Sequence, residues 1–157
     1  MDLVAGDPRE ILLAIGLDDL DGLDDRSRFA AHLALGAGLD PTWLDLFSEA
    51  CRSVTDGAEP RDFLDARREM DVPQIGSSSD VGERTVELVD AGWLAAVAEL
   101  PDDEIGPVAG RWIDLLDEEL GPLSREDKPW IRTLAADLVT FARAARSAPA
   151  VVFAWSI

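Results

Sequence analysis

The chain ends in PAVVFAWSI (residues 149–157), a stretch with the spacing of a β-strand. Its odd positions from 151 to 157 hold Val, Phe, Trp and Ile, so large apolar side chains would share one side of a sheet. Because an apolar strand exposes unpaired backbone groups, something must pair with it or cover it. The other stretch with strand character is MDLVA (residues 1–5), and we expect a two-stranded ribbon that joins the termini. Pairing across a homodimer and irregular packing into the core are the alternatives.

The rest of the chain carries the sequence signals of helices. Asp7-Pro8 and Asp40-Pro41 each place a capping aspartate before a proline at the first helical position. Apolar residues recur at helical spacing in residues 7–16, 26–36, 40–54, 59–70, 83–100, 101–121 and 124–147. We therefore predict a mainly α fold, a single compact domain over residues 1–157 with six or seven helices and a short C-terminal β-strand. The Ser-, Gly- and Pro-containing residues 71–80 are predicted to form an internal linker.

Composition narrows the class of protein. Of the 157 residues 47% are apolar and the mean hydropathy is +0.01, which is typical of a globular chain rather than a disordered acidic tail. No apolar run approaches the roughly 20 residues that span a bilayer, and no basic segment precedes an apolar one at the N-terminus. The single cysteine, Cys51, excludes an internal disulfide. These features favour a cytoplasmic location.

The net charge of −18 is unevenly distributed along the chain. Residues 1–120 hold 29 acidic and 9 basic side chains, whereas residues 121–157 hold 3 and 5. Such a surface repels phosphate backbones and anionic lipids, so we expect no direct nucleic-acid binding and no membrane association. It attracts cationic surfaces, so a basic protein is the partner that the charge favours.

The stretch LDDLDGLDD (residues 17–25) contains five aspartates and looks more like a site than any other part of the chain. Alignment of Gly22 with the glycine of an EF-hand calcium loop places Leu17 and Arg28 where the first and twelfth residues should be ligands. The match therefore fails at both ends. A solvated aspartate-rich loop that turns at Gly22 is the favoured interpretation.

The segment DLDG (residues 19–22), which follows the apolar ILLAIG, resembles the first motif of haloacid-dehalogenase-like phosphatases. The resemblance implies that Asp19 is a nucleophile and Asp21 its acid/base partner. The chain departs from that pattern because Leu23 follows the glycine, where the family has Thr or Val. Lys128, the single lysine, also follows the acidic pair at 102–103 instead of preceding it.

Two acidic pairs, Glu59/Asp62 and Glu87/Asp90, have the i,i+3 spacing that places both members on one face of a helix. Together they resemble the paired acidic helices of all-α nucleotide pyrophosphatases, which hold magnesium between carboxylates. The resemblance implies a small Mg²⁺-dependent phosphohydrolase. Acidic residues are 32 of the 157, however, so pairs at this spacing also arise by chance. Solvated helix faces are the favoured interpretation.

Histidine and cysteine chemistry is limited by the single residue of each kind, His32 and Cys51. One chain can build neither a tetrahedral Cys/His zinc site nor a di-iron bundle that needs two histidines. Cys51 follows Phe47 at helical spacing and is expected in the core, and His32, beside Phe29, is expected to be a half-buried helix residue. The sequence therefore assigns no catalytic, cofactor-binding or metal-ligating residue and no cofactor.

Among functions, the sequence favours a non-catalytic, acidic interaction or regulatory protein that binds a basic protein partner. The alternative is the small all-α Mg²⁺-dependent phosphohydrolase with helix-borne carboxylates. Trp155, in the basic C-terminal quarter, is the tryptophan that we consider as an interface anchor. A homodimer joined through the C-terminal strand is compatible with both functions.

Overall fold

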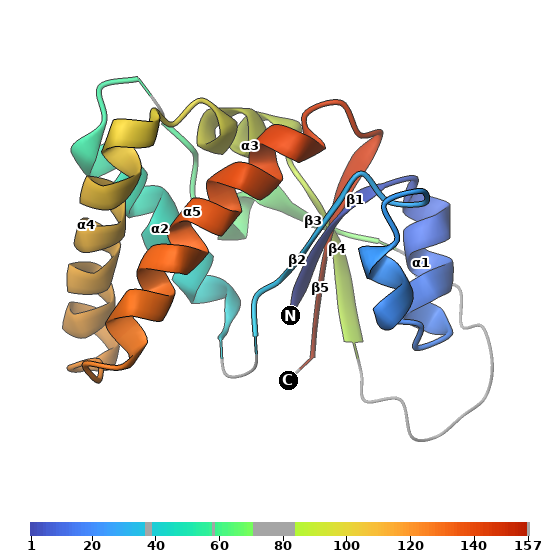
Figure 1. Cartoon of the computed structure of the whole chain (residues 1–157), viewed down its shortest axis with the longest axis horizontal. Coiled ribbons are helices and arrows are strands. Elements are labelled where there is room, and N and C mark those ends of the chain that lie inside the picture. The colour runs from blue at the N-terminus through green and yellow to red at the C-terminus, as the bar shows by residue number, and fades with distance from the viewer. Residues whose placement is uncertain (37–38, 58, 71–83, 157) are drawn as a thin grey trace.

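The computed structural model describes residues 1–36, 39–57, 59–70 and 84–156. Within these residues, one five-stranded antiparallel sheet with the order β2-β1-β5-β4-β3 lies between helices on its two faces (Figure 1). The strands are β1 (Asp2–Gly6), β2 (Ala31–Ala34), β3 (Arg67–Glu69), β4 (Arg84–Val89) and β5 (Ala150–Ser156). The helices are α1 (Pro8–Gly16), α2 (Pro41–Val54), α3 (Ala91–Ala98), α4 (Asp102–Leu120) and α5 (Asp127–Ala145). The short 3-10 turns η1 (Asp21–Asp24) and η2 (Leu64–Ala66) complete the fold.

The prediction of a mainly α domain with six or seven helices is wrong, because three stretches assigned to helices contain strands. Residues 26–36 hold β2, residues 59–70 hold η2 and β3, and residues 84–100 divide into β4 and α3. In the last stretch Val86, Val89 and Trp93 fit a helical stripe, although the first two lie in a strand. Asp90 separates the two elements by capping α3. The fold is therefore α/β.

The predicted pairing of the two termini is present, as two strands of the larger sheet. β5 pairs with β1 in the register Leu3↔Phe153, and on its other side with β4 in the register Glu87↔Phe153. Both edges of β5 thus pair with strands of the same chain over most of the strand, and the homodimer considered from the sequence stays a prediction. The outer strands of the sheet are β2 and β3.

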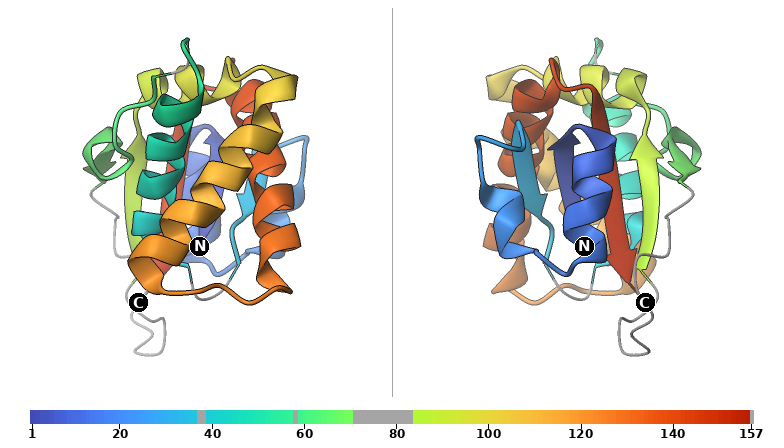
Figure 2. Two further views of the ribbon diagram at one scale, coloured as in Figure 1. Left: turned by 90° about the vertical axis from the view of Figure 1, so that its left-hand side faces the viewer. Right: turned by 90° about the vertical axis from the view of Figure 1, so that its right-hand side faces the viewer.

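Successive side chains of each strand point to opposite faces of the sheet, and an apolar layer covers each face. The layer on the side of α2 to α5 is the larger. Val4 and Val152, paired in register, lie on the face that α1 covers with Ile11. Their neighbours Leu3 and Phe153 lie on the opposite face, in the larger core beneath α2 to α5. Figure 2 shows the sheet from both sides, with α1 and the short turn η1 on one face and the other helices on the opposite face. Full burial of a Val, Leu, Ile, Phe or Met side chain stabilises a fold by about 1.5–3 kcal/mol relative to exposure.

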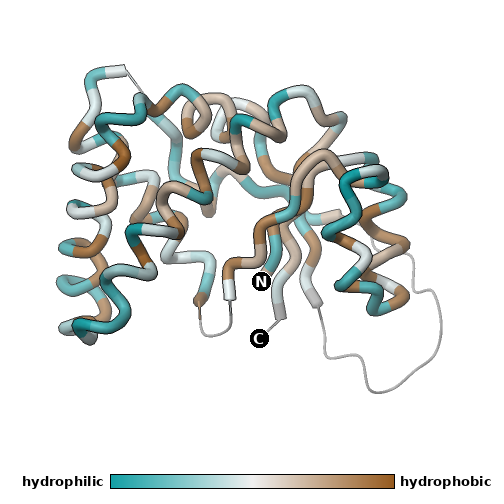
Figure 3. Tube along the Cα trace, viewed as in Figure 1, coloured by the Kyte–Doolittle hydropathy of each residue, from teal (hydrophilic) through white to brown (hydrophobic). Residues whose placement is uncertain are grey.

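The two longest helices form an antiparallel pair that brings opposite charges together. α4 is the most acidic helix, and α5 supplies Arg143 and Lys128, which pair with Asp102 at 2.6 Å and with Asp117 at 2.7 Å. Figure 3 shows polar and apolar residues alternating along both helices, as amphipathic helices require. The basic C-terminal quarter of the chain is therefore packed against its most acidic segment.

The predicted linker, residues 71–80, lies outside the described residues. In the part of the chain that the structure describes, no helix has both the length and the apolar character needed to cross a bilayer.

Candidate functional site

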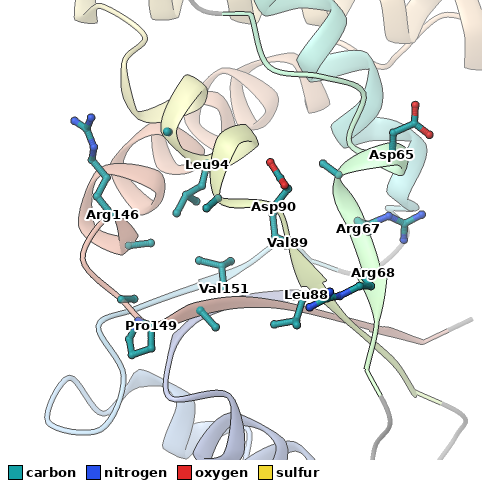
Figure 4. Close-up of a pocket in the computed structure, with 16 residues that line it drawn as sticks. Asp65, Arg67, Arg68, Leu88, Val89, Asp90, Leu94, Arg146, Pro149 and Val151 are labelled. Carbon is teal, nitrogen blue, oxygen red and sulfur yellow. The ribbon is translucent and has the colours of Figure 1, made fainter.

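The sheet splits at one end, and a cavity lies in the opening. Pairing between β4 and β5 ends at Leu88↔Val152. Beyond that pair β5 continues beside β1 as far as Ala150, while β4 continues beside β3 as far as Val89. β4 and β5 therefore diverge. A cavity of about 510 Å³ lies between their diverging ends, helix α3 and the end of α5 (Figure 4). Small-molecule sites fall in the range of roughly 300–1,000 Å³.

The lining of this cavity is mostly small and apolar. Of the sixteen described residues that line it, eleven are apolar, and six of these are alanines. The other five are Asp65, Arg67, Arg68, Asp90 and Arg146, so the lining carries a net charge of +1 in a chain whose net charge is −18. Apolar walls with a few charged groups are suited to binding a ligand. No signal in the sequence could have located this cavity, because the strand ends that frame it are distant in the chain.

The aspartate-rich loop is held together by its own side chains. Asp19 accepts a hydrogen bond from the Gly22 N–H at 3.2 Å and pairs with Arg28 at 3.3 Å. Asp25 accepts hydrogen bonds from the Ser27 hydroxyl at 2.7 Å and from its backbone N–H at 2.9 Å, and these bonds lower the pKa of Asp25. Among the described residues, no group of three or more His, Cys, Asp or Glu side chains is placed to hold a metal ion.

The resemblance to the phosphatase motif has no support in the local structure. ILLAIG, the stretch before Asp19, lies in helix α1, where that resemblance requires a strand. Asp21 begins η1 and is exposed. The proposed nucleophile Asp19 is engaged with Arg28 and with the turn at Gly22, so it has a structural role in this loop.

His32 connects the loop to the sheet. It lies in β2, so the expectation of a helix residue is wrong. Its Nε2 lies 3.0 Å from Asp2 Oδ1 and its Nδ1 lies 2.8 Å from Asp24 Oδ1, and its side chain is only 8% exposed. The hydrogen bond to Asp2 is the main cause that raises the pKa of His32, and the bond to Asp24 adds to it. When protonated, the imidazolium donates to both carboxylates and ties η1 to β1.

The two acidic pairs that suggested a magnesium site do not lie on helices. Glu59 is exposed in a non-helical segment, and Asp62 accepts a hydrogen bond from Arg52. Glu87 lies in β4, and Asp90 follows that strand and caps α3. The helix-borne carboxylates of the phosphohydrolase hypothesis are therefore absent at these four positions.

Glu87 instead belongs to a buried polar cluster that the sequence did not reveal. It forms an ion pair with Arg67 across the β3–β4 ladder, and both side chains are only 11% exposed. Its carboxylate also accepts a hydrogen bond from the Trp155 indole N–H at 3.1 Å. The Arg67 guanidinium lies 5.6 Å and 5.7 Å from the ring centroids of Phe63 and Phe153. Trp155, considered above as an interface anchor, thus makes its polar contact within the chain.

Cys51 lies in the core, as predicted. Its side chain is buried on the inner face of α2, and burial raises the pKa of the thiol to about 12. A thiol with such a pKa stays protonated at neutral pH and is a poor nucleophile.

The outer side of α4 carries acidic side chains that have few ion-pair partners among the described residues. Figure 2 shows α4 in front of α2 and α5, with one side turned away from the molecule. We define the α4 acidic face as Asp103, Glu104, Asp114 and Glu118. Helical geometry places these residues within about a third of the circumference, over about 22 Å of axis. Glu118 pairs with Arg111 at 3.3 Å, whereas the other three form no ion pair with any described residue.

Comparison with known proteins identified no relative of this chain. No protein-family model, curated protein or solved structure matches the chain.

Proposed function

We propose that the protein is a non-catalytic interaction protein that binds a basic partner protein through the α4 acidic face. The observation that carries this proposal is the contrast between the aspartate-rich loop and the α4 acidic face. Asp19, Asp24 and Asp25 of the aspartate-rich loop are engaged in internal hydrogen bonds and ion pairs. Asp103 and Asp114 are exposed on a well-formed helix without such partners in the described residues.

A rigid row of carboxylates suits electrostatic recognition. Free carboxylates on a helix hold a fixed spacing, so they can meet a matching row of lysine or arginine side chains with little loss of conformational freedom. The net charge of −18 would also accelerate the encounter with a cationic surface. Because the Debye length is about 10 Å at 0.1 M salt and about 3 Å at 1 M, such binding weakens strongly as salt is added.

The experiment is capture of the partner from extract of the organism's own cells by the immobilised chain, at 0.1 M and 0.5 M salt. The triple variant Asp103→Asn, Asp114→Asn, Glu118→Gln removes three charges from the face and is expected to lose the captured basic protein. Captured protein is then purified, and its affinity for each variant is measured by calorimetry. A loss of tenfold or more in affinity corresponds to at least about 1.4 kcal/mol.

The matched control is the triple variant Glu10→Gln, Asp21→Asn, Glu69→Gln, which removes the same charge from exposed sites outside α4. Glu10 matches Asp103 because each lies in the first turn of its helix. The control is expected to bind within twofold of the native chain. Equal weakening of both variants would show that net charge alone governs binding, and retention at high salt would also contradict the proposal.

A further inference from the structure

Among the described residues that line the cavity between the diverging ends of β4 and β5, Arg68 is the charged residue that both lacks an ion pair and extends towards the cavity. Arg67 is paired with Glu87, and Arg146 pairs with Glu99 at 3.4 Å. In Figure 4 the side chains of Arg146 and Asp65 both point away from the cavity. These residues frame the opening, but their charges are neutralised or directed elsewhere.

Arg68 differs from the other charged residues of the lining. Its side chain extends across Leu88 towards the opening, as Figure 4 shows, and it forms no ion pair with another described residue. Asp90 is the remaining charged group. Its Oδ1 accepts hydrogen bonds from the N–H groups of Gly92 at 2.8 Å and Trp93 at 3.2 Å, so the first turn of α3 offsets its charge. The cavity therefore presents one available cation beside a mostly apolar wall.

We propose that this cavity binds a small molecule with an apolar body and a single carboxylate, such as a medium-chain fatty acid. The guanidinium of Arg68 receives the carboxylate, for which its planar fork of N–H donors is well matched. The alanine-lined wall receives the apolar body, and the volume of about 510 Å³ is that of a small-molecule site. The site is distinct from the α4 acidic face, none of whose residues lines the cavity.

The test is titration of the full chain with decanoate, followed by the backbone amide NMR signals, at concentrations below micelle formation. Decanol supplies the same body without the charge, and acetate supplies the carboxylate without the body. We expect decanoate to shift the signals of residues around the cavity, such as Leu88, Ala95 and Val151. Decanol should bind at least tenfold more weakly, and acetate should leave the signals unchanged.

Two variants test separately the contact with the carboxylate and the contact with the apolar body, and a third is a control. Arg68→Gln, at an exposed position, should weaken decanoate binding about tenfold and leave the affinity for decanol unchanged. Ala95→Phe, which places a ring on the half-exposed side of α3 at the cavity wall, should weaken both ligands. Arg26→Gln removes an exposed arginine that does not line the cavity and should change neither affinity.

The proposal is overturned if decanoate does not bind, if decanol binds as tightly, or if Arg68→Gln and Arg26→Gln have equal effects. The triple variant of the α4 acidic face should retain decanoate binding. Failure of the partner capture and failure of the ligand site are thereby separate results.

Discussion

Removal of the Glu87 carboxylate should destabilise the protein more than any exposed charge substitution. In Glu87→Ala the guanidinium of Arg67, only 11% exposed, loses its ion-pair partner, and the Trp155 indole N–H loses its acceptor. Loss of one partner from a buried ion pair costs about 3–5 kcal/mol, because the other charge stays desolvated without compensation. We expect about 3 kcal/mol, a large fraction of the roughly 5–15 kcal/mol that stabilises a typical domain.

The double variant Arg67→Met, Glu87→Met tests the cause of that loss. It removes both charges, and the thioether at position 67 can pack against the rings of Phe63 and Phe153 that the guanidinium now faces. Replacement of a buried pair by apolar residues is often neutral, but the Trp155 indole N–H still loses its acceptor, so the double variant should recover part of the loss and be more stable than Glu87→Ala. Asp62→Ala, which breaks the exposed pair with Arg52, should cost less than about 1 kcal/mol.

The assay is urea unfolding followed by tryptophan fluorescence. With a slope of about 1–3 kcal/mol per molar urea, a loss of 3 kcal/mol lowers the midpoint by about 1–3 M. Two results would refute the reasoning: a cost for Glu87→Ala below about 1 kcal/mol, or a double variant less stable than Glu87→Ala. The first would mean that the pair is effectively solvated and does not hold β3 to β4, and the second that lost packing, not the uncompensated charge, causes the destabilisation.

Three further predictions concern single residues. The folded-state pKa of His32 is raised, so its contribution to stability is present in full below the unfolded pKa near 6.5 and is lost as the pH rises through the folded pKa. Urea unfolding at a series of pH values should show that the difference in unfolding free energy between the native chain and His32→Gln becomes smaller as the pH rises through this range. A difference that does not change with pH would contradict the assignment. Ser48→Ala should lower the free energy of unfolding by about 1–3 kcal/mol, because the buried Ser48 hydroxyl accepts a hydrogen bond from the Trp93 indole N–H at 2.8 Å. Ser53→Ala, at an exposed position, should leave the free energy of unfolding nearly unchanged in the same measurement. The Cys51 thiol, whose pKa burial raises to about 12, should not react with a thiol reagent at pH 8 in the native protein but should react in urea. Rapid labelling of the native protein would contradict this and would show that helix α2 opens readily.

Features that depend on neighbouring residues could be predicted, because their physical cause is local. Asp7 caps α1 by accepting the N–H of Arg9 at 2.8 Å, and Asp40 caps α2 by accepting the N–H of Thr42 at 2.7 Å. The alternation in residues 149–157 identified β5, and elimination of other stretches identified β1 as its partner. Cys51 was placed correctly because a helical stripe includes it.

The missed elements are those whose conformation depends on distant partners. β2 and β3 have only four and three residues, too few for a period of two to be distinguished from a helical stripe. Ala31 pairs with Ala5 and Arg67 with Val89, contacts that no local pattern reports. The same limit applies to the sites. The aspartate-rich loop drew attention by composition, whereas the cavity is framed by strand ends far apart in the chain.

By itself the sequence determined the positions of the capped helices, the apolar strand at the C-terminus and the excess of negative charge, because each follows from neighbouring residues or from composition. Only the tertiary structure decided which charges remain available. Packing of α5 against α4 neutralises Asp102 and Asp117 and leaves Asp103 and Asp114 outside, and pairing of β3 with β4 buries Glu87 against Arg67. The physical reason is that an ion pair or a cavity depends on distance in space, which chain folding sets between residues remote in sequence.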